Sequence, residues 1–93
     1  MSTCIPRQNE QVAYRVIDGS AALVSPRDSL LFWLNPTATC IWELADGQHT
    51  TQDIATRLSS DYDVDPKRAL GDTEQMVAAF AEKGLFTLVS SRR

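Results

Sequence analysis

The sequence predicts a small α+β domain that is winged-helix-like, with an N-terminal three-stranded antiparallel meander followed by three helices. Segments typical of strands come first and surround the turn signal Asp18-Gly19. Asn35 and Asp65 each precede a proline, an arrangement that marks the start of a helix. Because the strands precede the helices instead of alternating with them, the order favours α+β over a parallel βαβ arrangement.

The length indicates one domain. A chain of 93 residues buries roughly 60 to 65% of its unfolded surface, so the core is expected to be small. Residues 1–11 contain Pro6 and a polar run without a hydrophobic period, and we interpret them as a flexible tail. The folded domain then covers residues 12–89, and residues 90–93 form a C-terminal tail.

The first two expected strands form a hairpin. Residues 12–17 and 21–25 are strand-like, and both residues of the intervening Asp18-Gly19 pair adopt positive φ easily, as a two-residue hairpin turn requires. A second turn is predicted at residues 26–28, which begin with a proline.

The third expected strand, residues 29–33, is apolar on both faces. One interpretation is a buried strand covered on both sides. The other is an edge strand beside an apolar groove, where an extended peptide pairs with the backbone and its side chains enter pockets. The last strand of a meander is an edge, and an apolar edge is an aggregation hazard unless it binds a partner, so both interpretations stay open at this point.

The first expected helix lies within residues 34–47 and has a signal at each end. Asn35 is a good N-cap and Pro36 suits the first turn, while Gly47 can adopt the left-handed conformation beyond the C-terminus. An apolar stripe at helical spacing is formed by Ala38, Ile41, Trp42 and Ala45.

Two further helices follow. Thr50 and Asp53 form a weaker version of the capping box ahead of a stripe made by Ile54, Ala55, Leu58 and Tyr62. Asp65 starts the third helix, which Gly84 ends and whose apolar side contains Leu70, Thr73, Val77 and Phe80. Residues 85–89 are apolar and β-branched enough for a short terminal strand.

On the third helix, a second row beside the apolar side is formed by Asp72, Gln75, Met76 and Ala79. This row is a candidate for the opposite wall of the groove. Methionine suits variable partners because its thioether side chain is flexible, although Met76 could equally fill space in the core.

Composition excludes several functions. The net charge of −3 and a pI near 4.9 oppose binding to a nucleic-acid backbone, which needs clustered basic residues. No apolar run is long enough to span a membrane and the N-terminus does not resemble a signal peptide, so we expect a cytoplasmic protein without membrane association. Cys4 and Cys40 lie in different contexts, and we expect no disulfide between them.

The sequence offers no catalytic or metal-binding constellation. His49 is the single histidine and lies in a loop, Cys40 lies on an apolar helix face, and a glycine-rich phosphate loop is missing. Asp61, Asp63 and Asp65 resemble part of a calcium loop but lack its glycine and terminal glutamate. We therefore expect no enzyme activity and no cofactor.

Two alternative functions are a winged-helix nucleic-acid binder and a phosphopantetheine carrier protein. The acidic charge opposes the first. The second is suggested by Asp28-Ser29-Leu30, which matches the short motif where carriers receive the phosphopantetheine arm. A carrier serine opens a long helix, however, whereas Pro36 would interrupt any helix begun at Ser29.

One series of residues is typical of a known family: Leu34, Asn35, Thr37, Ala38, Ile41, Trp42, Glu43, Leu44, Asp46, Gly47, Thr50, Ile54, Leu58, Tyr62, Asp72, Phe80, Gly84 and Leu85. In these residues the chain resembles the PqqD-type peptide chaperones, which are recognition elements for ribosomally made, post-translationally modified peptides. The chain departs from the family pattern at Thr73 and Met76, where bulkier residues are more common.

This resemblance implies a chaperone that captures the leader of a precursor peptide by β-strand addition and presents it to a modifying enzyme, often a radical-SAM protein. The leader would bind the third strand beside the third helix. The expected peptide-binding residues are Ser29, Leu30, Leu31, Phe32, Trp33, Asp72, Gln75, Met76 and Ala79.

Overall fold

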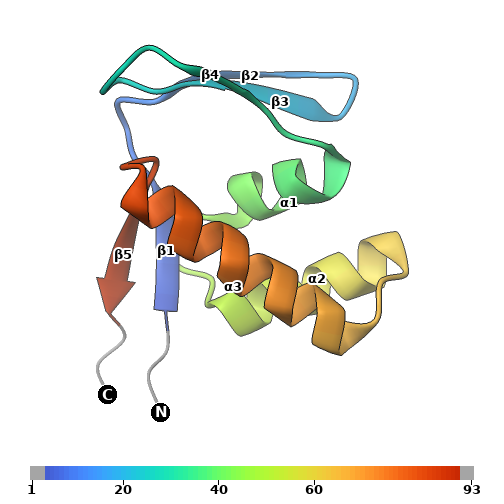
Figure 1. Ribbon diagram of the computed structural model, residues 1–93. Coiled ribbons are helices and arrows are strands. Elements are labelled where there is room, and N and C mark those ends of the chain that lie inside the picture. The colour runs from blue at the N-terminus through green and yellow to red at the C-terminus, as the bar shows by residue number, and fades with distance from the viewer. Residues whose placement is uncertain (1–3, 91–93) are drawn as a thin grey trace.

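The computed structural model describes residues 4–90 and has the expected α+β architecture, with a three-stranded meander followed by three helices (Figure 1). In chain order the elements are β1 (Cys4–Gln8), β2 (Ala13–Ile17), β3 (Ser20–Val24), β4 (Leu31–Trp33), α1 (Pro36–Leu44), α2 (Thr51–Tyr62), α3 (Pro66–Glu82) and β5 (Phe86–Ser90).

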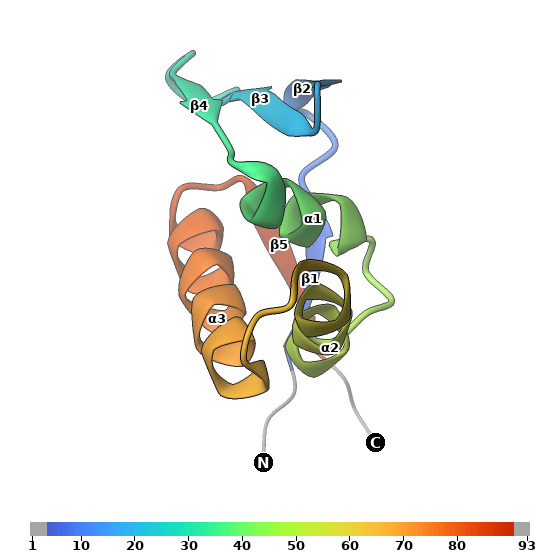
Figure 2. The same ribbon diagram turned by 90° about the vertical axis from the view of Figure 1, so that its right-hand side faces the viewer.

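The meander has the strand order β2-β3-β4, with both pairs antiparallel. Asp18 and Gly19 connect the first two strands with φ values of 52° and 81°, as the hairpin prediction required. The three strands form a roof above α1 (Figure 1), with β4 on the side of α3 and β2 on the opposite side (Figure 2). The sheet therefore has two open edges, and only the β4 edge lies next to α3.

The prediction of a flexible tail at residues 1–11 is wrong for the described part of that segment. Residues 4–8 form β1, which pairs antiparallel with β5 so that Ile5 lies opposite Val89. Polar side chains here have specific partners, since the Gln8 amide donates to the Trp42 carbonyl at 2.8 Å and the Asn9 amide to the Gly84 carbonyl at 2.8 Å. The strand was missed because its hydrogen-bonding partner lies at the other end of the chain.

The C-terminal boundary also differs from the prediction. The expected terminal strand exists as β5, but it includes Ser90, which was assigned to the tail. Residues 1–3 and 91–93 lie outside the described residues, so the two tail predictions are left open there.

The third strand of the meander is shorter than predicted. It begins at Leu31, whereas Ser29 and Leu30 belong to the preceding loop. Ser29 has φ of 61° and donates its N–H to the Ser25 carbonyl, and the Leu30 N–H donates to Asp28 Oδ1. These local hydrogen bonds close the loop, so pairing with β3 begins only beyond it.

The helix starts are as predicted. The Asn35 side chain accepts from the N–H of Ala38, and Asp65 caps α3 in the same way through the N–H groups of the first turn. A reciprocal capping box joins Thr50 and Asp53. Each cap uses groups within three residues of one another.

The end of α1 differs in detail. The helix ends at Leu44, and Gly47 lies beyond the cap with φ of 81°. Its N–H donates to the Pro6 carbonyl in β1 at 3.0 Å. The left-handed glycine therefore turns the chain against β1 and does not cap the helix itself.

The core is centred on a cluster of aromatic rings from α1, α3 and β5. The Trp42 side chain is fully buried and stacks on Phe86, with ring centroids 5.4 Å apart and an interplanar angle of 14°. Phe80 closes the cluster, 5.3 Å from Phe86 and 6.4 Å from Trp42. The expected apolar stripes point into this core, except that Tyr62 at the end of α2 is exposed.

Candidate functional site

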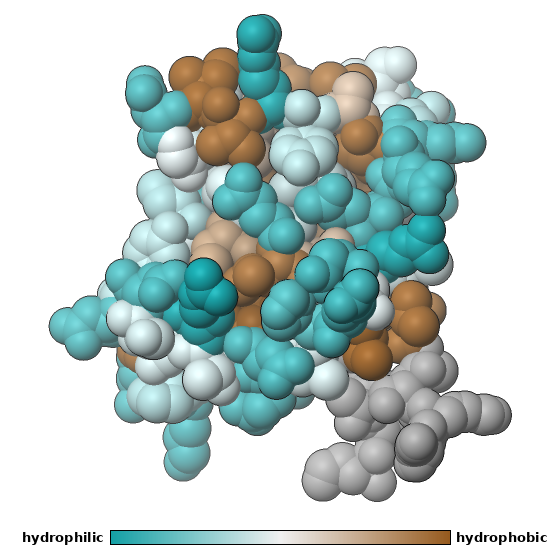
Figure 3. Space-filling view, turned by 180° about the vertical axis from the view of Figure 1, so that it is seen from behind, coloured by the Kyte–Doolittle hydropathy of each residue, from teal (hydrophilic) through white to brown (hydrophobic). Residues whose placement is uncertain are grey.

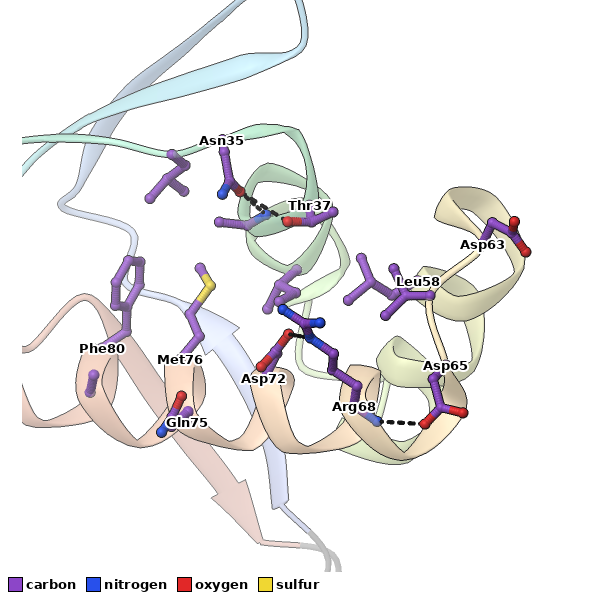
Figure 4. Close-up of a pocket in the computed structure, with 15 residues that line it drawn as sticks. Asn35, Thr37, Leu58, Asp63, Asp65, Arg68, Asp72, Gln75, Met76 and Phe80 are labelled. Atoms are coloured by element: carbon purple, nitrogen blue, oxygen red, sulfur yellow. Dashed lines mark hydrogen bonds and ion pairs between the residues drawn. The ribbon is translucent and has the colours of Figure 1, made fainter.

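A groove of about 830 Å³ lies between α1, the C-terminal end of α2 and α3 (Figure 4). Apolar side chains from all three helices form much of its lining. The lining residues are Leu34, Asn35, Thr37, Ala38, Ile41, Leu58, Asp63, Val64, Asp65, Arg68, Asp72, Gln75, Met76, Ala79 and Phe80.

The four residues predicted on the third helix, namely Asp72, Gln75, Met76 and Ala79, all line this groove. Met76 is half-buried and also packs against the core, so it belongs to the groove wall and to the core at once. Figure 4 shows it between Phe80 and Asp72 on the same helix. The helical spacing of these residues therefore places them along one wall.

The groove has a polar end at the α2–α3 turn. Asp63, Asp65 and Arg68 lie there, away from Phe80, and Asp72 lies between them and Met76 (Figure 4). Asp65 is occupied as the cap of α3, and Arg68 Nε lies 3.8 Å from Asp72 Oδ2 in an exposed ion pair. An exposed pair at this distance holds its partners only weakly, so both side chains can reorient toward a ligand.

The apolar end of the groove lies beside β4. Phe32 points inward from β4, and its ring centroid lies 6.4 Å from that of Phe80. Leu31 and Trp33 point to the opposite, outer face, where their side chains are 55% and 63% exposed. Because side chains alternate along a strand, Phe32 faces the groove, whereas Leu31 and Trp33 face solvent.

The register of β4 determines which of its backbone N–H and C=O groups point away from β3, toward the open edge of the sheet. The Ser25 N–H donates to the Leu30 carbonyl, and the Leu34 N–H donates to the Ala21 carbonyl. In an antiparallel pair the hydrogen-bonded residues alternate, so residues 30, 32 and 34 face β3. Leu31 and Trp33 therefore direct their N–H and C=O groups toward the open edge beside α3.

The predicted site on the third strand is accordingly divided. Leu31, Phe32 and Trp33 lie in β4, whereas Ser29 and Leu30 lie in the loop before it. Sequence reasoning did not assign several groove residues, including Leu34, Ile41 and Arg68. The apolar pattern of the sequence does not distinguish groove residues from core residues, because one apolar stripe of a helix faces the core at one position and the groove at the next.

A second cavity of about 250 Å³ lies beneath the β2–β3 hairpin and contains Cys40. Burial, reinforced by the Asp61 carboxylate, raises the pKa of the Cys40 thiol above its ordinary value. A raised pKa keeps the thiol protonated at neutral pH, which is the opposite of what a nucleophilic cysteine needs. Cys40 itself is half-buried.

His49 does not lie near the groove. Its Nδ1 lies 2.9 Å from Asp46 Oδ1, and this hydrogen bond lowers the pKa of the Asp46 carboxyl. Within residues 4–90, His, Cys, Asp and Glu side chains form no group of three suited to a metal ion. Over the same residues, no helix combines the length and the apolar character needed to cross a bilayer.

Three solved structures share this fold. The lasso peptide synthetase B1 complexed with the leader peptide is 25% identical, with a TM-score of 0.76, and the match covers 89% of this chain and 98% of that one. TbiB1 in complex with the TbiA(β) leader peptide is 22% identical, with a TM-score of 0.76 over 86% of this chain and 93% of that one, and at this identity the likeness concerns the fold alone.

The third structure is the PqqD truncation of Methylobacterium extorquens PqqCD, described as a functional and stand-alone recognition element for ribosomally synthesized and post-translationally modified peptides. It is 30% identical to this chain, with a TM-score of 0.71 over 88% of this chain and 87% of that one. None of the curated proteins matches the chain.

The family described as coenzyme PQQ synthesis protein D (PqqD) matches residues 20–85, which are 66 of the 93 residues. That span includes the meander from β3 onward, all three helices and every residue of the groove lining. The chain therefore belongs to the PqqD family.

Proposed function

We propose that this protein is a non-catalytic chaperone that binds the leader of a ribosomal precursor peptide by β-strand addition at β4 and presents it to a separate modifying enzyme. The observation that carries the proposal is an open strand edge directly beside an apolar groove. Leu31 and Trp33 supply the edge, and the α3 residues Met76 and Ala79 line the groove. The relatives that carry leader peptides share this fold.

Because the β4 edge is short, its backbone hydrogen bonds supply only part of the binding free energy, and side chains supply the rest. Leu31 and Trp33 offer two groups each, and at about 0.5 to 1.5 kcal/mol per net hydrogen bond the four bonds give roughly 2 to 6 kcal/mol. Micromolar affinity requires about 8 kcal/mol. Side chains that enter the groove must supply the remainder, so recognition depends on the sequence of the leader.

The modifying enzyme is a separate protein in this proposal, and by family resemblance a radical-SAM enzyme is the first candidate. No cofactor is needed for peptide presentation. The chaperone acts by raising the local concentration of the precursor at the enzyme, since a bound leader turns a bimolecular encounter into a tethered one.

The two rival functions are disfavoured by specific observations. A phosphopantetheine carrier needs its serine at the start of a long helix, whereas Ser29 lies in the β3–β4 loop with φ of 61°. A nucleic-acid binder needs clustered basic residues, but the polar end of the groove contains Asp63, Asp65 and Asp72 against Arg68 alone.

The test is a titration of the ¹⁵N-labelled protein with a synthetic leader from a candidate ribosomal precursor peptide. Amide shifts are expected at Leu31 and Trp33 and along the groove wall at Met76, with little change in β1. A 20-base-pair DNA duplex at moderate salt serves as the competitor. Tighter binding of the duplex than of the leader would contradict the proposal.

A further inference from the structure

The outer face of the meander exposes apolar side chains that the fold itself leaves uncovered. Leu31 and Trp33 in β4 are 55% and 63% exposed, and Val24 in β3 and Ile17 in β2 are 39% and 48% exposed. Figure 3, seen from behind, shows apolar side chains along the top of the molecule with hydrophilic ones between them. Large apolar groups clustered on one face are typical of a binding surface.

The register aligns these side chains in rows across the strands. Leu31 lies opposite Val24, and Trp33 lies opposite Ala22. Residues directly opposite one another in a sheet point to the same face, with Cβ atoms about 4.5 to 5.5 Å apart. A strand added at the β4 edge would extend both rows by one side chain each.

The same register determines where each residue of an added strand would point. Residues opposite Leu31 and Trp33 would point outward, two positions apart in the added strand. The residue between them would lie opposite Phe32, whose ring centroid lies 6.4 Å from that of Phe80 in the groove lining. Three consecutive residues of the added strand would therefore meet apolar surface on both faces of the sheet.

Resting on the proposed function, we propose that the bound leader strand contains three consecutive apolar residues. The central one enters the groove, and the two flanking ones cover Leu31 and Trp33 on the outer face. These flanking residues distinguish this chain's ligand from a strand that only alternates between apolar and polar. Polar flanking residues would leave the Trp33 and Leu31 side chains in water and forgo their cross-strand contacts.

The occupant of this surface is a leader strand because the two most exposed apolar side chains of the sheet, Leu31 and Trp33, belong to the same residues that direct free backbone groups to the edge. A ligand that pairs with those groups must place its own side chains beside them. Ile17 and Val24 lie farther from the edge, so they provide a control on the same face.

The test uses a displayed library of random 12-residue peptides selected on the immobilised full chain and sequenced before and after selection. The wild-type chain should enrich peptides with three adjacent apolar residues. Leu31→Ser combined with Trp33→Ser should lower the enrichment of apolar residues at the two flanking positions at least several-fold and keep it at the central one. Ile17→Ser should leave all three preferences unchanged.

Different results overturn different statements. Apolar enrichment at the central position alone, with flanking positions as in the unselected library, overturns this inference and leaves peptide binding intact. Loss of the flanking preference in Ile17→Ser also overturns this inference. The whole outer face would then act as the binding surface, as it would for a second copy or another protein. A library with no enrichment at any position overturns the proposed function as well.

Fluorescence gives an independent measurement on the same surface. Trp33 is largely exposed and Trp42 is fully buried, so a peptide that covers Trp33 should shift the emission to shorter wavelength. The most enriched peptide should cause this shift in the wild-type chain and not in Trp33→Phe. A peptide that binds without any shift in the wild-type chain contradicts coverage of Trp33.

Discussion

The hydroxyl of Thr39 in α1 accepts a 2.8 Å hydrogen bond from the backbone N–H of Ala21 in β3. The same hydroxyl donates to the Leu34 carbonyl at 3.3 Å, and both Thr39 and Ala21 are buried. One side chain thus joins the meander to the helix beneath it and to the segment that leads out of β4. The position of the β4 edge relative to the groove depends on this contact.

We therefore expect Thr39→Val to destabilise the fold by about 1 to 3 kcal/mol, because it leaves the Ala21 N–H buried without a partner while the volume is nearly conserved. Urea denaturation measures the change. Thr39→Ser keeps the hydroxyl and should recover most of the lost stability. Wild-type stability in Thr39→Val, with a loss confined to Thr39→Ser, would show that the methyl group and not the hydrogen bond is responsible.

Proline substitutions in β4 test the assignment of its backbone groups. The Leu31 N–H faces the open edge, so Leu31→Pro should keep the pairing with β3 and weaken leader binding by about 0.5 to 1.5 kcal/mol for one lost donor. Phe32→Pro removes an N–H that faces β3 and should destabilise the fold itself. Circular dichroism and calorimetric titration separate the two effects. Wild-type affinity in a folded Leu31→Pro variant would exclude this N–H from recognition.

Two adjacent alanines on α3 provide a matched test of the groove wall. Ala79 lines the groove and Ala78 does not, and both side chains are exposed. Ala79→Glu should reduce leader affinity at least tenfold by placing a charge against the bound side chains, whereas Ala78→Glu should leave it unchanged. Both variants should unfold at the wild-type temperature. Similar effects at the two positions would point to overall charge instead of the groove.

Met76 in the same wall should tolerate a change of shape but not of polarity. Met76→Leu conserves volume, so leader affinity should change by less than about 1.5 kcal/mol. The measurement is a titration with the same synthetic leader. A complete loss of binding in Met76→Leu, together with wild-type binding of a leader N-methylated at alternate amides, would rule out strand addition in favour of a side-chain pocket.

The two tryptophans should behave in opposite ways. Trp42 is fully buried against Phe86 and does not line the groove, so Trp42→Ala should cost about 3 to 5 kcal/mol, enough to unfold a domain of this size. Trp33→Ala should change stability by less than about 0.5 kcal/mol because the side chain is exposed. Thermal denaturation compares them, and a folded Trp42→Ala that had lost only binding would contradict the assignment.

Gly71 offers a stabilising substitution. It lies inside α3, and a Cβ added there would meet nothing within 4 Å. Gly71→Ala should therefore stabilise the fold by about 1 kcal/mol through helix propensity alone, with leader affinity unchanged. The chemical denaturation midpoint should rise without a change in slope. A loss of affinity would mean that the bound peptide approaches the helix at this glycine.

The local elements of this protein were determined by the sequence alone. The caps at Asn35, Thr50 and Asp65 join groups no more than three residues apart, and the Asp18-Gly19 turn depends on the φ values of two adjacent residues. Interactions of this range can be recognised without knowing where the rest of the chain lies. The order of strands and helices followed from them.

The tertiary structure decided what depends on distant partners. β1 exists because β5 provides its hydrogen bonds, and Pro6 is buried in a segment whose polar composition indicated a tail. The groove was decided by the approach of α1 and α3 around Ile41 and Met76. In each case the contact that stabilises the feature joins residues far apart in the sequence, so no local pattern contains it.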